Sequence, residues 1–207
     1  LAVAAEPYPV KVNVQVIQEL DDRRSRENPI SYEAVRLKEH IALANNDMPV
    51  AIERFEAANK LKPMKPDVIL ILFQVLDMSK RPEDAEKLGR QMIATNKDFG
   101  PIYDLLYIMY IKQNRIDDAE KILIQKSESN PKNAQFQLQL AGHYLGAKRR
   151  PQMEEILKKM LANTKDYPEA YMMVGDLFYR IREWDRSSQI FTEGMKQFPK
   201  DKAIYQK

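Results

Sequence analysis

The sequence repeats itself every 34 residues, and this period constrains the fold more than any other feature. A column of mostly small residues comprises Ala51, Ala85, Ala119, Met153 and Ser187. A large apolar column comprises Ala42, Leu76, Tyr110, Tyr144 and Phe178. The residues that end each period are Pro63, Lys97, Pro131, Lys165 and Pro199. A fixed period without insertions is typical of repeat architectures, so we expect five copies of one unit, each buried against its neighbours.

Each period is predicted to contain two helices. In the third period the i, i+3, i+4, i+7, i+8 spacing of a helix face is occupied by Tyr103, Leu106, Tyr107, Tyr110 and Ile111. After a polar break at 112–115, a second stripe from Ala119 to Lys126 follows the same spacing until the last turn. Prolines suit the first helical turn, because no partner is needed for the missing N–H. The prolines predicted to open helices are Pro49, Pro66, Pro82, Pro101, Pro151 and Pro168.

These signals predict ten helices in the five periods. Ser31 and Asn133 are candidate N-caps, since their side-chain oxygens can accept from a free N–H of the first turn. The predicted ranges are 32–45, 49–61, 67–79, 82–96, 101–113, 116–129, 134–146, 151–163, 168–181 and 184–197.

The period resembles the tetratricopeptide repeat family over residues 32–201. The last copy carries the resemblance best, through Tyr171, Val174, Gly175, Phe178, Ser187, Phe191, Gly194 and Pro199. The resemblance implies an all-α fold, a right-handed α-solenoid of antiparallel helix pairs. The repeats are then 32–65, 66–99, 100–133, 134–167 and 168–201.

The two ends are predicted to be incomplete repeats. Residues 13–31 are interpreted as a lone second helix, residues 1–12 as a loose N-terminal segment or linker, and residues 202–207 as the start of a further repeat. Residues 1–5 also fit the tail of a secretory signal, but the linker is favoured because no basic region precedes them. A solenoid normally ends in polar capping helices. We therefore expect a piece of a longer array, with self-association through the uncapped ends as an alternative.

Composition disfavours most catalytic classes. The chain has no cysteine, which excludes disulfides, thiolate nucleophiles and zinc–thiolate sites, and six glycines against twelve prolines. Its two histidines, His40 and His143, have no partner at metal-ligand spacing. No glycine-rich loop follows a strand, and no apolar run is long enough to span a bilayer. The prediction is a protein that is not an enzyme, with no cofactor, no metal site and no integral membrane segment.

Charge disfavours nucleic acid as a partner. The net charge of +3 is small beside 33 basic and 30 acidic residues, and only the fourth repeat is clearly basic, through 148–150 and 158–159. Phosphate binding requires a longer stripe of cations. The tyrosines of 103–110 coincide with core columns, so packing is predicted for them. Trp184, the single tryptophan, is interpreted as packing against its turn, with an interface anchor as the alternative.

The family resemblance implies a ligand groove lined by the first helix of each repeat. The candidate groove residues carried over from the family positions are Arg36, His40, Leu70, Gln74, Asp104, Ile108, Gln135, Leu138, Met172, Asp176 and Tyr179. Family members that grip the C-terminal carboxylate of chaperones use lysine, asparagine and arginine there. Since Leu70 and Gln74 replace part of that set, we expect instead an apolar groove that binds a helix or an extended peptide.

The most direct interpretation is a non-catalytic scaffold that binds a protein or peptide partner in this groove. An alternative is the regulatory or assembly region of a larger protein, either a multidomain enzyme or bacterial envelope and export machinery. A helical-repeat RNA binder is the third reading and the least favoured. The compartment is left open between the cytoplasm and the bacterial periplasm or envelope.

Overall fold

A computed structural model describes residues 47–199, and every described element is a helix. The helices are α3 (Met48–Leu61), α4 (Pro66–Met78), α5 (Pro82–Thr95), α6 (Gly100–Lys112), α7 (Ile116–Ser129), α8 (Ala134–Gly146), α9 (Arg150–Ala162), α10 (Ala170–Arg180) and α11 (Trp184–Gln197). Each bound falls within two residues of the predicted one. The predictions for residues 1–46 and 200–207, including Ser31 and the partial repeats, lie outside the described residues.

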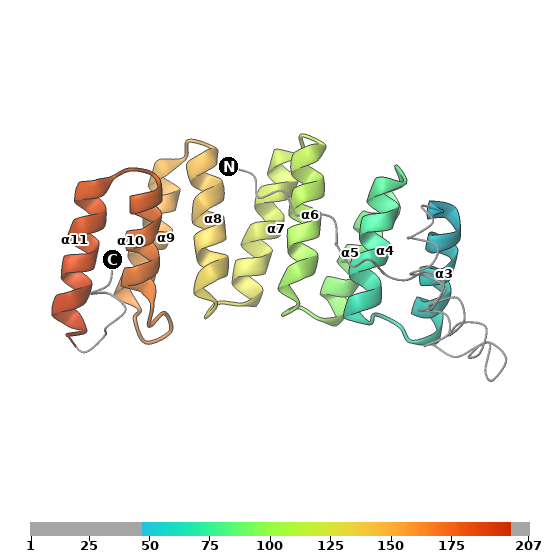
Figure 1. Ribbon diagram of the computed structural model, residues 1–207, viewed down its shortest axis with the longest axis horizontal. Coiled ribbons are helices and arrows are strands. Elements are labelled where there is room, and N and C mark those ends of the chain that lie inside the picture. Colours follow the sequence, from blue (N-terminus) through green and yellow to red (C-terminus); the bar gives the residue numbers. More distant parts are fainter. Residues whose placement is uncertain (1–46, 200–207) are drawn as a thin grey trace, which may run out of the picture. The chain divides into compact units, whose positions relative to one another are not determined.

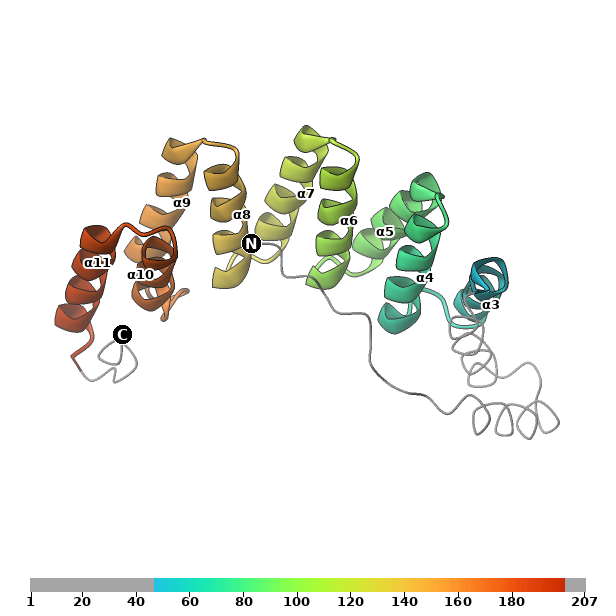
Figure 2. The same cartoon turned by 45° about the horizontal axis from the view of Figure 1, so that its top comes forward.

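The chain forms two compact units, residues 1–105 and 106–207, and the boundary falls inside α6. In the first unit, α4 packs on both α3 and α5. In the second unit, contacts run from α7 to α8, α9, α10 and α11 in chain order, and α8 also contacts α10. Consecutive helices joined by short turns are visible in each unit (Figures 1 and 2). The fold is an all-α repeat solenoid, as the sequence period predicts.

The turn between the two helices of a repeat has the same geometry in four successive copies. A left-handed residue follows the first helix, and these residues are Lys80, Asn114, Lys148 and Arg182, with φ between 58° and 64°. The next N–H bonds to a carbonyl five residues back, as from Arg149 to Tyr144 at 2.8 Å. This is the Schellman arrangement, which usually contains glycine. The scarcity of glycine therefore has a local consequence, because residues with side chains occupy the left-handed position.

The small-residue column lies where the two helices of a repeat pack closely. All five of its members are buried. In the last repeat the Ser187 hydroxyl donates to the Gly175 carbonyl at 2.9 Å, which joins α11 to α10. A Cβ at Gly194 would lie only 2.8 Å from the Tyr171 Cβ. This close approach explains why glycine occurs in the second helix of this pair.

One local prediction is wrong. Pro168 does not open a helix: α10 begins at Ala170, because the Tyr167 N–H bonds to the Asn163 carbonyl and the Ala170 N–H to the Tyr167 carbonyl, both at 3.0 Å in a turn. Lys126 lies within the buried stripe of α7, where the sequence pattern placed it. Its side chain is buried, donates to the Gln139 side-chain oxygen at 2.7 Å, and lies 4.1 Å from the Phe136 ring centroid.

The contact at Gly194 predicts a measurable cost of adding one methyl group. Gly194→Ala should lower the free energy of unfolding by about 1–2 kcal/mol, because the new Cβ meets a Tyr171 atom that is fixed close to its backbone. Gly142→Ala is the matched control, since a Cβ there meets nothing within 4 Å and should raise stability by up to about 1 kcal/mol. Urea unfolding followed by circular dichroism measures both. Equal effects of the two substitutions would contradict the close packing of α10 on α11.

The left-handed turn predicts the opposite effect for a glycine substitution. Lys80→Gly should raise the free energy of unfolding by about 1 kcal/mol, because its φ of 59° costs a side-chain residue more than glycine. Lys87→Gly, at an exposed position inside α5, should lower it by a similar amount. Thermal and urea unfolding of both variants tests the sign. If Lys80→Gly also destabilises, the side chain of Lys80 contributes more than its backbone costs.

Candidate interaction surface

The predicted groove residues are accessible on the first helices of the repeats, within each of the two units. Of the nine that are described, none is buried. Gln74, Ile108, Gln135 and Tyr179 are exposed, and the half-buried ones are Leu70, Asp104, Leu138, Met172 and Asp176. Arg36 and His40 lie outside the described residues. The predicted positions are therefore accessible on their helices, whereas the core columns of the same helices are buried.

In the second unit three first helices are linked by contacts. α8 contacts α10, and the Tyr107 ring of α6 meets the His143 ring of α8 edge-on with centroids 5.8 Å apart. Ile108, Leu138 and Met172 thus lie on neighbouring helices of one unit. Leu138, however, packs against the buried core cluster of this unit. It serves inter-helix packing, so its replacement by a charged residue would disturb the fold as well as the surface.

Large apolar side chains at the turns extend the predicted groove residues, since Tyr179 belongs to that set and Trp184 does not. Tyr179 is 58% exposed and Trp184 52% exposed, and their rings meet edge-on at 4.8 Å with an interplanar angle of 69°. Ile111 and Ile116 stand at the equivalent positions two repeats earlier and are 39% and 42% exposed. The sequence could have indicated these exposed turn residues, because Tyr179 and Trp184 occupy the same repeat positions as Ile111 and Ile116. Trp184 packs on Tyr179 across the turn, as predicted, yet half of it faces solvent.

Arginines at the start of the second helices stack on the aromatic column of the first helices. The guanidinium carbon of Arg115 lies 4.5 Å from the Tyr110 ring centroid, and that of Arg149 lies 4.7 Å from the Tyr144 centroid. Arg149 also donates to Glu120 of the preceding second helix. Each arginine thus joins a cation–π contact to ion pairing at the same edge of the repeat. Sequence reasoning treated these residues as polar turn positions and missed the contacts.

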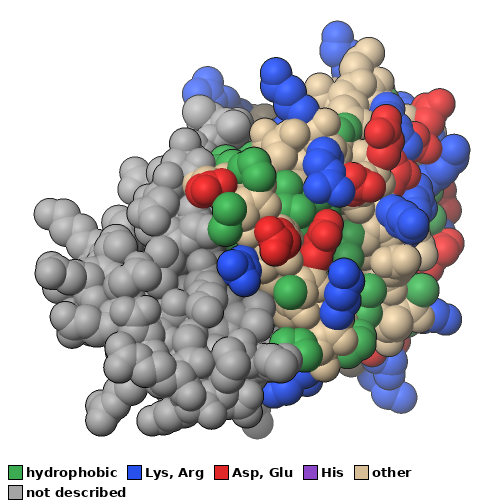
Figure 3. All heavy atoms as spheres, turned by 90° about the vertical axis from the view of Figure 1, so that its right-hand side faces the viewer, with side chains coloured by type: hydrophobic (Ala, Val, Ile, Leu, Met, Phe, Trp, Pro, Cys, Tyr) green, Lys and Arg blue, Asp and Glu red, His purple; other side chains and the backbone are tan. Residues whose placement is uncertain are grey.

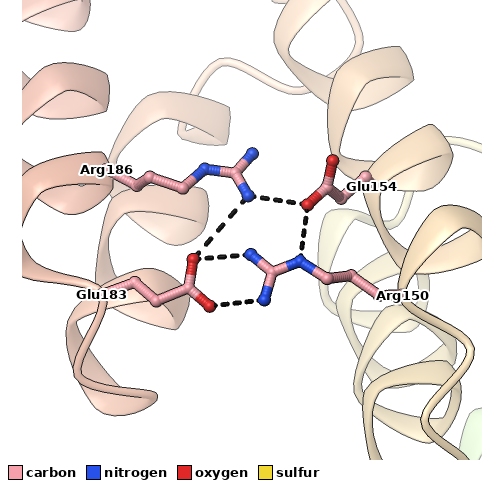
Figure 4. A network of polar contacts seen from close by, with 4 residues as sticks. All are labelled: Arg150, Glu154, Glu183 and Arg186. Atoms are coloured by element: carbon pink, nitrogen blue, oxygen red, sulfur yellow. Dashed lines mark hydrogen bonds and ion pairs between the residues drawn. The ribbon is translucent and has the colours of Figure 1, made fainter.

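The last junction carries a four-residue ion network (Figure 4). Arg150 of α9 donates to both oxygens of Glu183, at 2.7 and 2.6 Å, and to Glu154 at 2.8 Å. Arg186 of α11 donates to Glu154 at 2.7 Å. These bonds lower the pKa of the Glu154 carboxyl, chiefly through Arg186, and that of Glu183, chiefly through Arg150. The network joins α9 to the start of α11 and leaves its own four charges balanced.

His143 is the one buried histidine of the described residues, and its ring meets the rings of Tyr107 and Tyr144 edge-on. Its Nδ1 lies 3.3 Å from the Tyr107 hydroxyl, and its Nε2 has no hydrogen-bond partner among residues 47–199. Burial lowers the His143 pKa, an effect that Glu120 opposes and Arg149 reinforces. The neutral imidazole is therefore the form that the fold stabilises.

Charge on the surface is mixed in sign. Acidic and basic side chains alternate over the described part of the face shown in Figure 3, with apolar side chains between them. Within residues 47–199, no cluster of three or more metal-ligating side chains is found. None of the described helices combines the length and the hydropathy needed to cross a bilayer.

Comparisons with known proteins give a family assignment for part of the chain. Residues 110–177 match the family model described as a tetratricopeptide repeat. No curated protein has a sequence that matches the chain. The matched segment spans α7, α8 and α9 and most of α10, whose packing is described above.

Solved structures extend the likeness to most of the chain. A tetratricopeptide repeat protein from Parabacteroides merdae aligns over 84% of this chain and 70% of its own, at 17% identity and a TM-score of 0.51. A MamA double mutant, MamA RS-1 ArsTM, aligns over 70% of this chain and 91% of its own, at 14% identity and a TM-score of 0.50. YrrB, a repeat protein described as having an unusual peptide-binding site, aligns over 75% of this chain and 80% of its own, at 16% identity and a TM-score of 0.48.

Residues 110–177 are therefore assigned to the tetratricopeptide repeat family, and the solved structures show the same fold over most of the chain. The family model confirms, for this segment, the resemblance drawn from the 34-residue columns. Such repeats generally form non-catalytic scaffolds that bind protein or peptide partners. At these identities the solved structures establish the fold alone.

The environment of His143 predicts a pH-dependent stability. Its folded pKa is below the ordinary value of 6.5, so in mildly acidic solution the unfolded chain binds more protons than the folded one. The free energy of unfolding should therefore fall as the pH falls through about 6.5, by at most about 1.4 kcal/mol per pH unit. His143→Gln should remove this slope. Urea unfolding between about pH 7.5 and 5.5, above the range where carboxylates titrate, measures it.

The second histidine provides the control for this experiment. His40→Gln should leave the slope unchanged if His143 alone causes it. A slope that persists in His143→Gln would show that another group is responsible.

Proposed function

We propose that the protein is a non-catalytic scaffold and that the first-helix surface of its second unit binds a polypeptide segment. The observation that carries the proposal is the exposure of large apolar residues on that surface. Ile108 is 47% exposed and Tyr179 58% exposed, whereas the core residues of the same helices, such as Tyr110 and Phe178, are buried. Exposed apolar residues in one region favour a protein partner, because removing their surface from water makes association favourable.

The character of the neighbouring residues supports a peptide or helix as the ligand. Half-buried Met172 adds an adaptable apolar contact, and Gln135 and Asp176 supply hydrogen-bonding groups beside it. A few apolar anchors within a polar rim are typical of peptide recognition. The carboxylate-gripping mode of chaperone-binding relatives is not proposed, since Leu70 and Gln74 occupy part of that set.

A charge placed at the best exposed position tests the proposal. Ile108→Glu should abolish the capture of peptides that are selected on the full chain from a displayed library, because a buried unpaired carboxylate opposes binding. Its helicity should be unchanged, since Ile108 is not part of the core. The capture assay and circular dichroism measure these two properties.

Met78→Glu is the matched control. Met78 is the most exposed large apolar residue of the described chain, at 68%, and lies at the end of α4, outside the proposed surface. It should retain full capture. Equal capture by the parent and Ile108→Glu would refute the proposed surface. A library that yields no binder would argue against peptide recognition altogether.

A further inference from the structure

We propose that the turn between α10 and α11 is a second docking point, which takes an acidic polypeptide segment carrying one aromatic or large aliphatic side chain. The inference rests on the proposed function, because Tyr179 belongs to both surfaces. Beyond the proposed function, it specifies that the partner is acidic and that Trp184, outside the predicted groove residues, is an anchor for it. The residues that define this turn edge are Tyr179, Trp184, Arg180, Arg182 and Lys148.

The aromatic pair is not required by the repeat fold. In the 34-residue register, Tyr179 and Trp184 correspond to Asp77 and Pro82 in the second repeat, and to Leu145 and Arg150 in the fourth. The turn keeps its backbone geometry with all of these side chains. Two half-exposed aromatic rings in contact therefore have no structural role that the other repeats share. Tryptophan and tyrosine are the residues most enriched at binding hot spots.

The geometry of the pair favours a single side chain as its ligand. The two rings meet at 69°, with centroids 4.8 Å apart, so they form an open corner of one ring face and one ring edge. A third aromatic or aliphatic group can contact both rings there. Successive bases of a single-stranded nucleic acid stack parallel to one another and could not use both rings. The corner thus fits a peptide anchor better than a strand of bases.

The cations at this edge determine the charge of the partner. Arg180, Arg182 and Lys148 are exposed, and none forms an ion pair with a described residue. Lys148 belongs to the neighbouring turn, which the contact between Arg150 and Glu183 holds against this one (Figure 4). Arginine beside an aromatic anchor is itself typical of interfaces, because it can bind a carboxylate through two hydrogen bonds.

Of the three acidic residues near this turn, Glu183 is already paired. Glu183 is bonded by Arg150 and Arg186 and does not neutralise the three cations. Asp185 is exposed beside Trp184, and Asp176 lies one turn before Tyr179. The three cations therefore exceed the exposed acid at the turn, which suits a short acidic segment. Cation–carboxylate attraction at the rim gives orientation and speed, and the aromatic corner gives affinity.

The single tryptophan allows a direct test on the full chain. The probe is a short peptide of Glu and Asp with one central Phe. Titration should shift the Trp184 emission to shorter wavelength and saturate, because the half-exposed indole loses water. Two control peptides should bind about tenfold or more weakly: one has Lys in place of the acids, and the other has Ser in place of Phe.

Substitutions then locate the binding site by anisotropy of the labelled peptide. Trp184→Ala and the double variant Arg180→Glu, Arg182→Glu should each weaken binding about tenfold or more, and Trp184→Phe should restore most of it. Ile116→Ala is the matched control, since Ile116 stands at the equivalent position of the third repeat and is similarly exposed. It should bind as the parent does. Circular dichroism verifies that each variant is folded.

The remaining outcomes overturn the inference in distinguishable ways. If Ile108→Glu abolishes binding and Trp184→Ala does not, the groove stands and the turn edge fails. If neither variant changes binding, or no peptide shifts the tryptophan emission, the turn edge also fails. If an oligouridylate RNA shifts the emission and the acidic peptide does not, the partner is a nucleic acid and the proposal is wrong.

Discussion

The close packing of the two helices within each repeat is the constraint on which the rest of the structure depends. One buried small-residue position per period brings the second helix against the first, and in the last repeat this contact is tightened by the Ser187–Gly175 hydrogen bond. First helices also pack on the second helix before them, as α4 does on α3 and α8 on α7, so only part of their surface remains for solvent. Ile108 and Tyr179 lie on that remaining surface.

Neighbouring repeats are joined at the turn edge by charge and by aromatic faces. Arg115 and Arg149 each stack on the aromatic residue of their own first helix, and Arg149 also reaches Glu120 of the previous repeat. At the last junction Glu183 stands where the arginine would be, and Arg186 stacks on Phe178 instead. Arg150 then bonds Glu183 directly (Figure 4). This rearrangement pairs Glu154 and Glu183 with Arg150 and Arg186, and the cations Arg180, Arg182 and Lys148 are exposed beside it.

Much of this fold could be predicted from the sequence, because the 34-residue period can be recognised without knowing any long-range contact. Helix spacing, proline positions and the small column are local, and they located the described helix ends to within two residues. The predicted helix start at Pro168 failed because the backbone hydrogen bonds of Asn163 and Tyr167 form a turn there. Tertiary contacts decided other positions: Lys126 can be buried because Gln139 and Phe136 satisfy its charge. Similarly, Leu138 fits the groove pattern but packs against the core.

The sequence by itself determined the class of fold, since a 34-residue period with two helical stripes buries its apolar faces by stacking helix pairs on their neighbours. It also placed the candidate groove residues on the accessible positions of the first helices. Only the tertiary structure decided which side chains are free to act. Burial of His143, exposure of the Tyr179–Trp184 corner and neutralisation of Glu183 all depend on residues about one repeat away or across a turn. Those distances are set by packing between helices, which no local pattern encodes.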